Sequence, residues 1–139
     1  MTFQDLPHDL YLHPLTDPRL VADVLDLCVP LQDRQAGALC VLICDERDCL
    51  AQPVVIGEIG RPRADERLEL LGNIVQMAQG VMPGGALLLA IARADGLSLT
   101  ADDELWATTA AVAADDYRLL GVHVVTMHGS REIPYPSAA

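Results

Sequence analysis

The chain has 139 residues, a length typical of one domain. Hydrophobic residues make up 51% of it and charged residues 21%, a composition that excludes a disordered chain, and aromatic residues at only 4% predict a mainly aliphatic core. The formal net charge of -11 repels phosphate backbones, so nucleic-acid binding is disfavoured.

No apolar run approaches the roughly 18 residues that a membrane-spanning helix needs, and the N-terminus lacks the basic and apolar regions of a signal peptide. We therefore expect a cytoplasmic protein without membrane contact, whose cysteines are reduced. Cys40 and Cys44 lie inside an apolar segment, whereas zinc sites usually place a Cys-x2-Cys pair on a tight turn. These two cysteines are predicted to pack in the core.

The first predicted element is a helix that follows an irregular lead-in over residues 1–16. Asp17 is typical of a helix cap and Pro18 of the first helical position, while Pro30 stops the helix near Val29. Its apolar positions recur with helical period and predict one buried face: Leu20, Val21, Val24, Leu25 and Cys28. A polar loop is expected over residues 32–37.

Two strands are predicted next, over about 38–44 and 52–59, joined by a polar turn. An amphipathic helix over about 65–80 leads to the apolar run 86–90, which is typical of a strand buried on both faces. The basic residues before and at the start of this helix are interpreted as solvated: Arg61, Arg63 and Arg67.

The last predicted helix covers about 101–120, from a capping-box-like Thr100-x-x-Asp103 to Gly121 as the C-terminal cap. A strand over 122–126 follows. The expected buried face of the helix consists of Leu105, Trp106, Thr109, Val112 and Ala113.

These elements predict one domain over residues 17–130, followed by an irregular tail over 131–139. Their order is α-β-β-α-β-α-β, in which hairpin and crossover connections are mixed. The sequence therefore predicts an α/β (α+β) fold with a mixed β-sheet flanked by helices.

Four features of this order carry a resemblance to a known family. A capped helix precedes a strand that ends in a charged turn, a second strand ends at Gly57, and an amphipathic helix leads to the apolar strand. A glycine-containing loop then opens a helix at Thr100-x-x-Asp103. Over about residues 18–128 the chain resembles the JAB/MPN metallopeptidase-like fold, in particular its RadC-like branch.

In active members of that family, a His-x-His pair and the aspartate of Ser-x-x-Asp hold zinc, and an upstream glutamate activates the bound water. The resemblance places the histidine positions at about Ala90 and Ala92, the aspartate at Asp103 and a candidate glutamate at Glu58. Alanine cannot coordinate zinc, so we expect no zinc-dependent hydrolysis, no metal and no cofactor. Asp103 is also explained as a helix cap, and Glu58 as a surface charge at a strand end.

The other histidines do not predict a replacement metal site. His123 and His128 lie five residues apart and point to opposite faces of an extended strand, while His8 and His13 fall in the lead-in. Acidic residues of the loop and helix start are candidate oxygen ligands for a divalent cation, although acids at a helix start also suit its dipole: Asp95, Asp102, Asp103 and Glu104.

Two hypotheses about function follow. The first is a catalytically inactive JAB/MPN-like domain that acts as a protein-interaction or dimerisation module, with a protein partner or a second copy. The alternative is a small-ligand or divalent-cation binding protein, or an enzyme, with a rebuilt site in the same cleft. The candidate residues for that site are Asp95, Thr100, Asp103, Glu58 and His123. A different α/β fold with the same element order also stays open.

Overall fold

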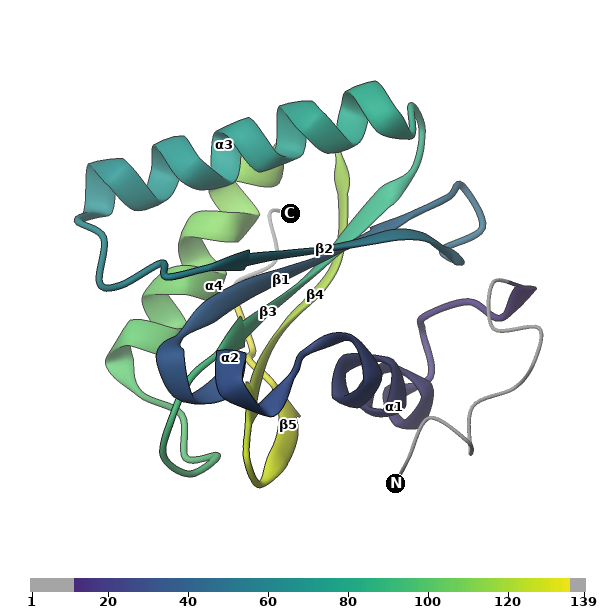
Figure 1. Cartoon of the computed structure of the whole chain (residues 1–139). Helices are drawn as coiled ribbons and strands as arrows, with labels where there is room; N and C mark the ends of the chain where they lie inside the picture. Colours follow the sequence, from purple (N-terminus) through teal and green to yellow (C-terminus); the bar gives the residue numbers. More distant parts are fainter. Residues whose placement is uncertain (1–11, 136–139) are drawn as a thin grey trace.

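The computed structural model describes residues 12–135, which form a mixed five-stranded sheet flanked by helices (Figure 1). The strand order is β2-β1-β3-β4-β5; β3 and β4 are parallel and the other neighbours are antiparallel. The predicted fold class, α+β with a mixed sheet, is thereby confirmed. In chain order the elements are α1 (Pro18–Cys28), α2 (Leu31–Ala36), β1 (Ala38–Cys44), β2 (Leu50–Gly57), α3 (Ala64–Val81), β3 (Ala86–Ala92), α4 (Ala101–Ala114), β4 (Arg118–Thr126) and β5 (Gly129–Glu132).

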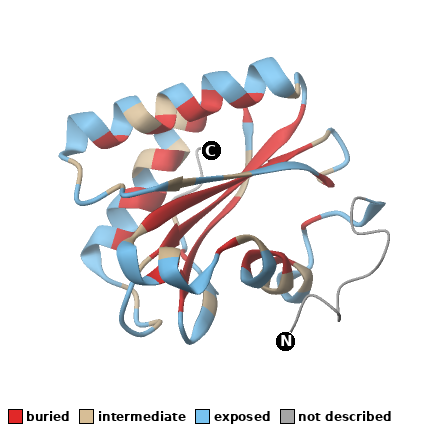
Figure 2. Ribbon diagram, in the orientation of Figure 1, coloured by how far each residue is buried: buried red, intermediate tan, exposed pale blue. Residues whose placement is uncertain are grey.

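The helices cover the two faces of the sheet as separate layers, with α3 and α4 on one face and α1 on the other (Figure 1). Every residue of the central strands β1 and β3 is buried, as the continuous apolar runs predict (Figure 2). Burying a large aliphatic side chain stabilises the fold by roughly 1.5–3 kcal/mol. The two strands therefore carry much of the hydrophobic stabilisation.

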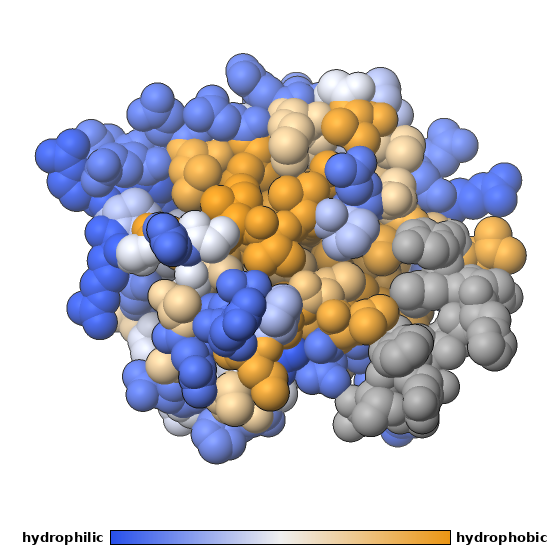
Figure 3. All heavy atoms as spheres, in the orientation of Figure 1, coloured by the Kyte–Doolittle hydropathy of each residue, from blue (hydrophilic) through white to orange (hydrophobic). Residues whose placement is uncertain are grey.

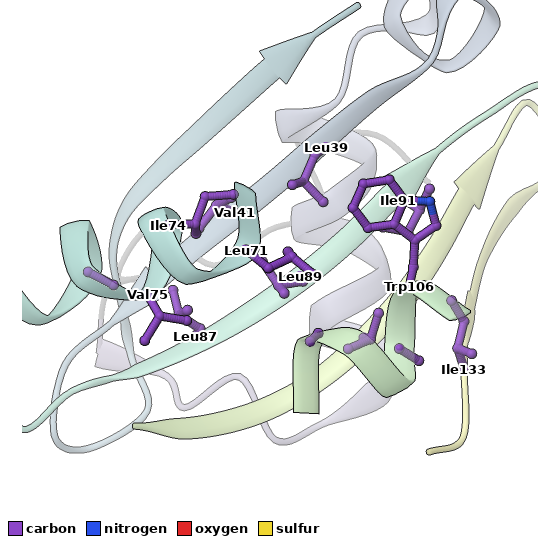
Figure 4. Close-up of a cluster of buried hydrophobic side chains, with 14 of the residues drawn as sticks. Leu39, Val41, Leu71, Ile74, Val75, Leu87, Leu89, Ile91, Trp106 and Ile133 are labelled. Carbon is purple, nitrogen blue, oxygen red and sulfur yellow. The ribbon is translucent and has the colours of Figure 1, made fainter. Parts of the chain in front are cut away.

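The larger core lies between the sheet and the α3–α4 layer (Figure 4). Alternate residues of β1 and β3 point into it, because side chains alternate across a strand. They meet the apolar stripe of α3 and the single tryptophan of the chain, Trp106 of α4, which is 2% exposed. The side chains labelled in Figure 4 are Leu39, Val41, Leu71, Ile74, Val75, Leu87, Leu89, Ile91, Trp106 and Ile133.

The prediction of a polar loop over 32–37 is wrong, because the helix α2 occupies most of this segment. Buried Arg34 holds this helix in place: its Nε donates to the Val29 carbonyl at 2.9 Å and its Nη1 to the Thr126 carbonyl at 3.2 Å. Its Nη2 donates to the Asp26 carbonyl and carboxylate at 3.0 and 3.1 Å. The sequence did not predict this helix, because a charged residue in a polar segment is expected to be exposed, whereas Arg34 is buried.

The predicted end of the last helix is also wrong. The helix ends at Ala114, because Asp115, with a φ of 50° and a ψ of -111°, departs from helical geometry. The strand β4 then begins at Arg118, so Gly121 lies inside a strand and caps no helix.

The predicted buried face of α4 needs correction too. Trp106 is buried as expected, but Leu105 and Val112 are 53% and 64% exposed. The residues that face the core are largely small ones, namely Ala107, Ala110 and Ala114. Beyond its first turn, α4 is apolar nearly all round, so the spacing of apolar residues does not identify the buried face. The alanines that face the core allow the helix to pack close to the sheet.

The described ends of the chain are more ordered than the sequence indicates. Leu15, in the expected lead-in, is 2% exposed, and its N–H donates to the Asp48 carbonyl at 2.8 Å. The strand β5 reaches Glu132, inside the expected irregular tail. The predictions for 1–11 and 136–139 lie outside the described residues. Within 12–135, no helix is both long enough and apolar enough to cross a membrane.

Candidate functional site

The loop between β3 and α4 is organised by one side chain, Arg93, which follows the last residue of β3. All of its N–H-bearing nitrogens are engaged. Nη1 donates to the carbonyls of Ala94 and Gly96 at 3.0 and 2.9 Å, and Nη2 donates to the Ser98 carbonyl at 3.0 Å. A single planar guanidinium therefore holds three carbonyls of the loop around it.

The same guanidinium forms a bidentate ion pair with Asp103 of α4. Arg93 Nε donates to Oδ1 at 3.0 Å and Nη2 to Oδ2 at 2.8 Å. The Asp103 side chain is 1% exposed and that of Arg93 is 20% exposed. Burial alone raises the pKa of Asp103, but hydrogen bonds from Arg93 and Thr100 outweigh burial and lower it. The pair thus holds Asp103 as a carboxylate.

Thr100 and Asp103 also form the predicted capping box. The Thr100 Oγ1 accepts the N–H of Asp103 at 3.1 Å, and Asp103 Oδ2 accepts the N–H of Thr100 at 3.0 Å. Two N–H groups that the first helical turn leaves unpaired are satisfied in this way. The helix-cap explanation of Asp103 is confirmed, and its second partner, Arg93, is new.

A second buried arginine joins α3 to α4. Arg67 Nη2 donates to Asp102 Oδ1 at 2.8 Å, and its guanidinium carbon lies 4.8 Å from the centre of the Trp106 ring. The residue is 4% exposed, so the prediction of a solvated Arg67 is wrong. Stacking on the indole compensates part of the cost of burying the charge.

These elements border a cleft of about 400 Å³ at the carboxyl end of β3. Open α/β sheets commonly bind ligands at this place. Its walls carry charges of both signs, Arg61 and Arg93 against Asp95 and Asp102. The remaining lining residues are Gln35, Ala36, Gly37, Ile59, Gly60, Ile91, Ala92, Ala94, Thr100 and Trp106.

Of the candidate residues of the rebuilt site, Asp95 and Thr100 line this cleft, together with Asp102 from the candidate cation ligands. Asp103 lies behind Arg93 and does not line it. Glu58 is exposed, has a φ of 56° and follows β2, and it does not line the cleft either. The interpretation of Glu58 as a strand-end surface charge fits this position.

His123 belongs to a different part of the molecule. It lies on β4, is 8% exposed and borders a separate cavity of about 280 Å³ together with Leu15 and Pro18. Burial lowers its pKa, and Glu132, whose Oε2 lies 4.0 Å from His123 Nε2, acts in the opposite direction. His123 therefore does not contribute to the cleft beside Arg93.

The positions that the family resemblance assigns to zinc ligands are part of the core. Ala90 and Ala92 are 0% and 1% exposed and pack in the cluster beneath α1. Within 12–135, no three His, Cys, Asp or Glu side chains lie close enough together to hold a metal ion. Cys40 and Cys44 are buried as predicted, and burial raises the pKa of each thiol to about 12.

Sequence reasoning missed the two arginines that shape this region, Arg93 and Arg67. The position of Arg93 offered one signal: it directly follows a wholly apolar strand, where a partly buried charge needs a partner. Asp103 is that partner, because the capping box places its carboxylate at the start of α4, beside the end of β3.

Comparison with known proteins finds no matching family model, no similar curated protein and no similar solved structure. The resemblance to the JAB/MPN fold therefore stays a prediction from the sequence motifs.

Proposed function

We propose that this chain is a catalytically inactive JAB/MPN-like domain that acts as a protein-interaction or dimerisation module. The observation that carries the proposal is the bidentate Arg93–Asp103 pair. Asp103 is the one zinc-ligand position of the family that keeps a ligating residue type. Here its two oxygens are occupied by a guanidinium.

Zinc binding at this position meets two obstacles. A metal has to displace Arg93 from Asp103 and then lie close to the positive charge it has displaced. It also lacks the two imidazoles, because Ala90 and Ala92 offer no donor atom. The guanidinium thus supplies the positive charge that balances the buried carboxylate, which is the charge a metal supplies in an active member.

An interaction role is supported by the surface. Single exposed hydrophobic residues are ordinary, but a contiguous apolar patch on an otherwise charged protein favours contact with a partner. Figure 3 shows such a patch in the region between α3 and α1, on the side where β2 lies in front of the sheet.

Zinc titration tests the non-catalytic part of this proposal. Purified chain, equilibrated with zinc and then dialysed, is expected to retain far less than one zinc per chain by elemental analysis. Asp103→Asn is the matched control, because it removes the candidate ligand and keeps the side-chain size. Stoichiometric zinc in the natural chain that is lost in Asp103→Asn overturns the proposal.

The cleft supports a second candidate function, binding of a small anionic ligand. Arg61 lines the cleft and forms no ion pair with any residue of the described part of the chain, and Trp106, which is 2% exposed, also contributes to the lining. Because Trp106 is the only tryptophan, its fluorescence reports occupancy. Titration with small carboxylates and phosphates is expected to change this signal in the natural chain and not in Arg61→Gln. No change with any of them contradicts this candidate.

A further inference from the structure

The two edges of the sheet differ in how well they are protected. β5 is a four-residue edge strand that carries Arg131 and Glu132, and short charged edges discourage pairing with other chains. β2 has eight residues, Leu50–Gly57, and none of them is charged. It is therefore the edge open to another strand.

The register shows which backbone groups of β2 face outward. Glu58 donates its N–H to the Gly37 carbonyl at 3.1 Å, so Gly57 and Ala38 form a non-hydrogen-bonded pair. Antiparallel pairs alternate, so the backbone of Val55 and Pro53 also faces away from β1. Pro53 has no N–H to donate, which suits an outward position on an edge strand.

The outward groups are hence the N–H and C=O of Val55 and Gly57 and the C=O of Pro53. Among residues 12–135, β1 is the only strand that pairs with β2, and no turn or loop bond reaches these groups. Val55 is 37% exposed, while Val54 and Ile56 on either side pack against the α3-side core. The strand β2 therefore combines unpaired backbone groups with apolar side chains, and it crosses the apolar patch between α3 and α1 (Figure 3).

We infer that β2 pairs antiparallel with β2 of a second copy of this chain, which joins the two sheets into one. The inference rests on the proposed interaction function and names its partner. Two copies with a net charge of -11 each repel one another over most of their surfaces. Contact through the uncharged β2 places no like charges opposite each other. Two copies of the same strand can also pair antiparallel about a two-fold axis, the usual symmetry of a homodimer.

The geometry also specifies the register. The regular register of β2 covers residues 52–57, beyond the bulge between Ile43 and Cys44, and Val55 is the middle one of its three outward-facing residues, Pro53, Val55 and Gly57. With the two-fold axis at Val55, the two copies of Val55 exchange two N–H···O bonds. Gly57 of each copy then donates to Pro53 of the other copy, whose carbonyl faces outward. Only the absent N–H of Pro53 leaves a gap in the ladder.

Sedimentation and light scattering over a range of concentrations test the inference. The natural chain is expected to be a dimer that salt strengthens, because salt screens the repulsion between the acidic copies. Val55→Arg is expected to shift the population to monomer. The matched control is Val112→Arg on α4, which adds the same charge at another exposed valine and leaves the dimer unchanged.

Cross-linking tests the register independently of whether Val55→Arg folds. Hydrogen-bonded antiparallel partners have Cα atoms about 5.5 Å apart, within disulfide range. Val55→Cys is expected to form a covalent dimer under oxidation, and Val112→Cys is not. A natural chain that stays monomeric at high concentration, or a dimer that survives Val55→Arg without cross-linking through Val55→Cys, overturns the inference. A monomer that binds no zinc overturns the β2 pairing and leaves the non-catalytic proposal intact. A dimer that binds zinc through Asp103 supports the β2 pairing and overturns the non-catalytic proposal.

Discussion

Removing the Arg93 side chain tests how the loop between β3 and α4 is held. The Asp103 side chain is 1% exposed in the natural chain, and Arg93→Ala removes both of its charge-assisted hydrogen bonds. The Thr100 N–H is then its main remaining partner. We expect a large loss of stability, because a buried charge without its counter-charge is poorly solvated.

The structure sets the size of this loss. Breaking a buried ion pair by removing one partner costs about 3–5 kcal/mol, and Arg93 is partly exposed, so about 3 kcal/mol is expected. The carbonyls of Ala94, Gly96 and Ser98 add little, because these residues are exposed and water replaces the guanidinium there. For a chain of this length, the loss corresponds to a decrease in Tm of about 10 °C.

Urea unfolding followed by circular dichroism and by the fluorescence of Trp106 measures this free energy. Arg131→Ala is the matched control, because Arg131 also contacts the loop, through the Leu97 carbonyl at 3.2 Å, but is exposed. It is expected to cost less than about 0.5 kcal/mol. Arg93→Lys, which keeps the charge and loses the planar fork, is expected to lie between them. A cost below about 1 kcal/mol for Arg93→Ala refutes the assigned role of the ion pair.

Two further predictions concern the carboxylate and the glycines. The folded-state pKa of Asp103 lies below its ordinary 3.8, so its stabilisation is present above about pH 4 and is lost as the pH falls through the folded pKa. The stability difference between the natural chain and Asp103→Asn, from urea unfolding at several pH values, is therefore expected to shrink in acid; a constant difference contradicts this. A Cβ on Gly85 lies 2.2 Å from the Cys44 carbonyl oxygen, whereas one on Gly72 of α3 meets nothing within 4 Å. Gly85→Ala is expected to lower Tm strongly and Gly72→Ala to raise stability by up to about 1 kcal/mol, and the reverse order of Tm values contradicts the packing.

The elements with one dominant local signal were predictable from the sequence. The start of α1 at Asp17 and Pro18 and the buried run of β3 are examples, and the Thr100–Asp103 capping box is confirmed atom by atom. In each case, residues adjacent in the sequence decide the structure. The end of α4 has no such signal, because Asp115 and Asp116 suit the exposed face of a longer helix as well as the turn that they form before β4.

The candidate site was harder to predict because long-range partners decide it. Arg67 looks like a solvated charge until Asp102 and Trp106 of another helix are placed beside it. Likewise, Asp95 in the loop and Asp103 at the helix start belong to the same acidic group in the sequence, yet Asp103 lies behind Arg93 and Asp95 lines the cleft. Only the packing of α3 and α4 on the sheet separates these roles.

The central position of β3 has a consequence for synthesis of the chain. Its neighbours are β1, already made, and β4, which lies beyond α4. A nascent chain that ends before Arg118 has a β3 edge that is wholly apolar and without a partner, and such edges promote aggregation. We therefore expect the chain to complete its fold only after β4 emerges from the ribosome, so that any expressed fragment has to include this strand.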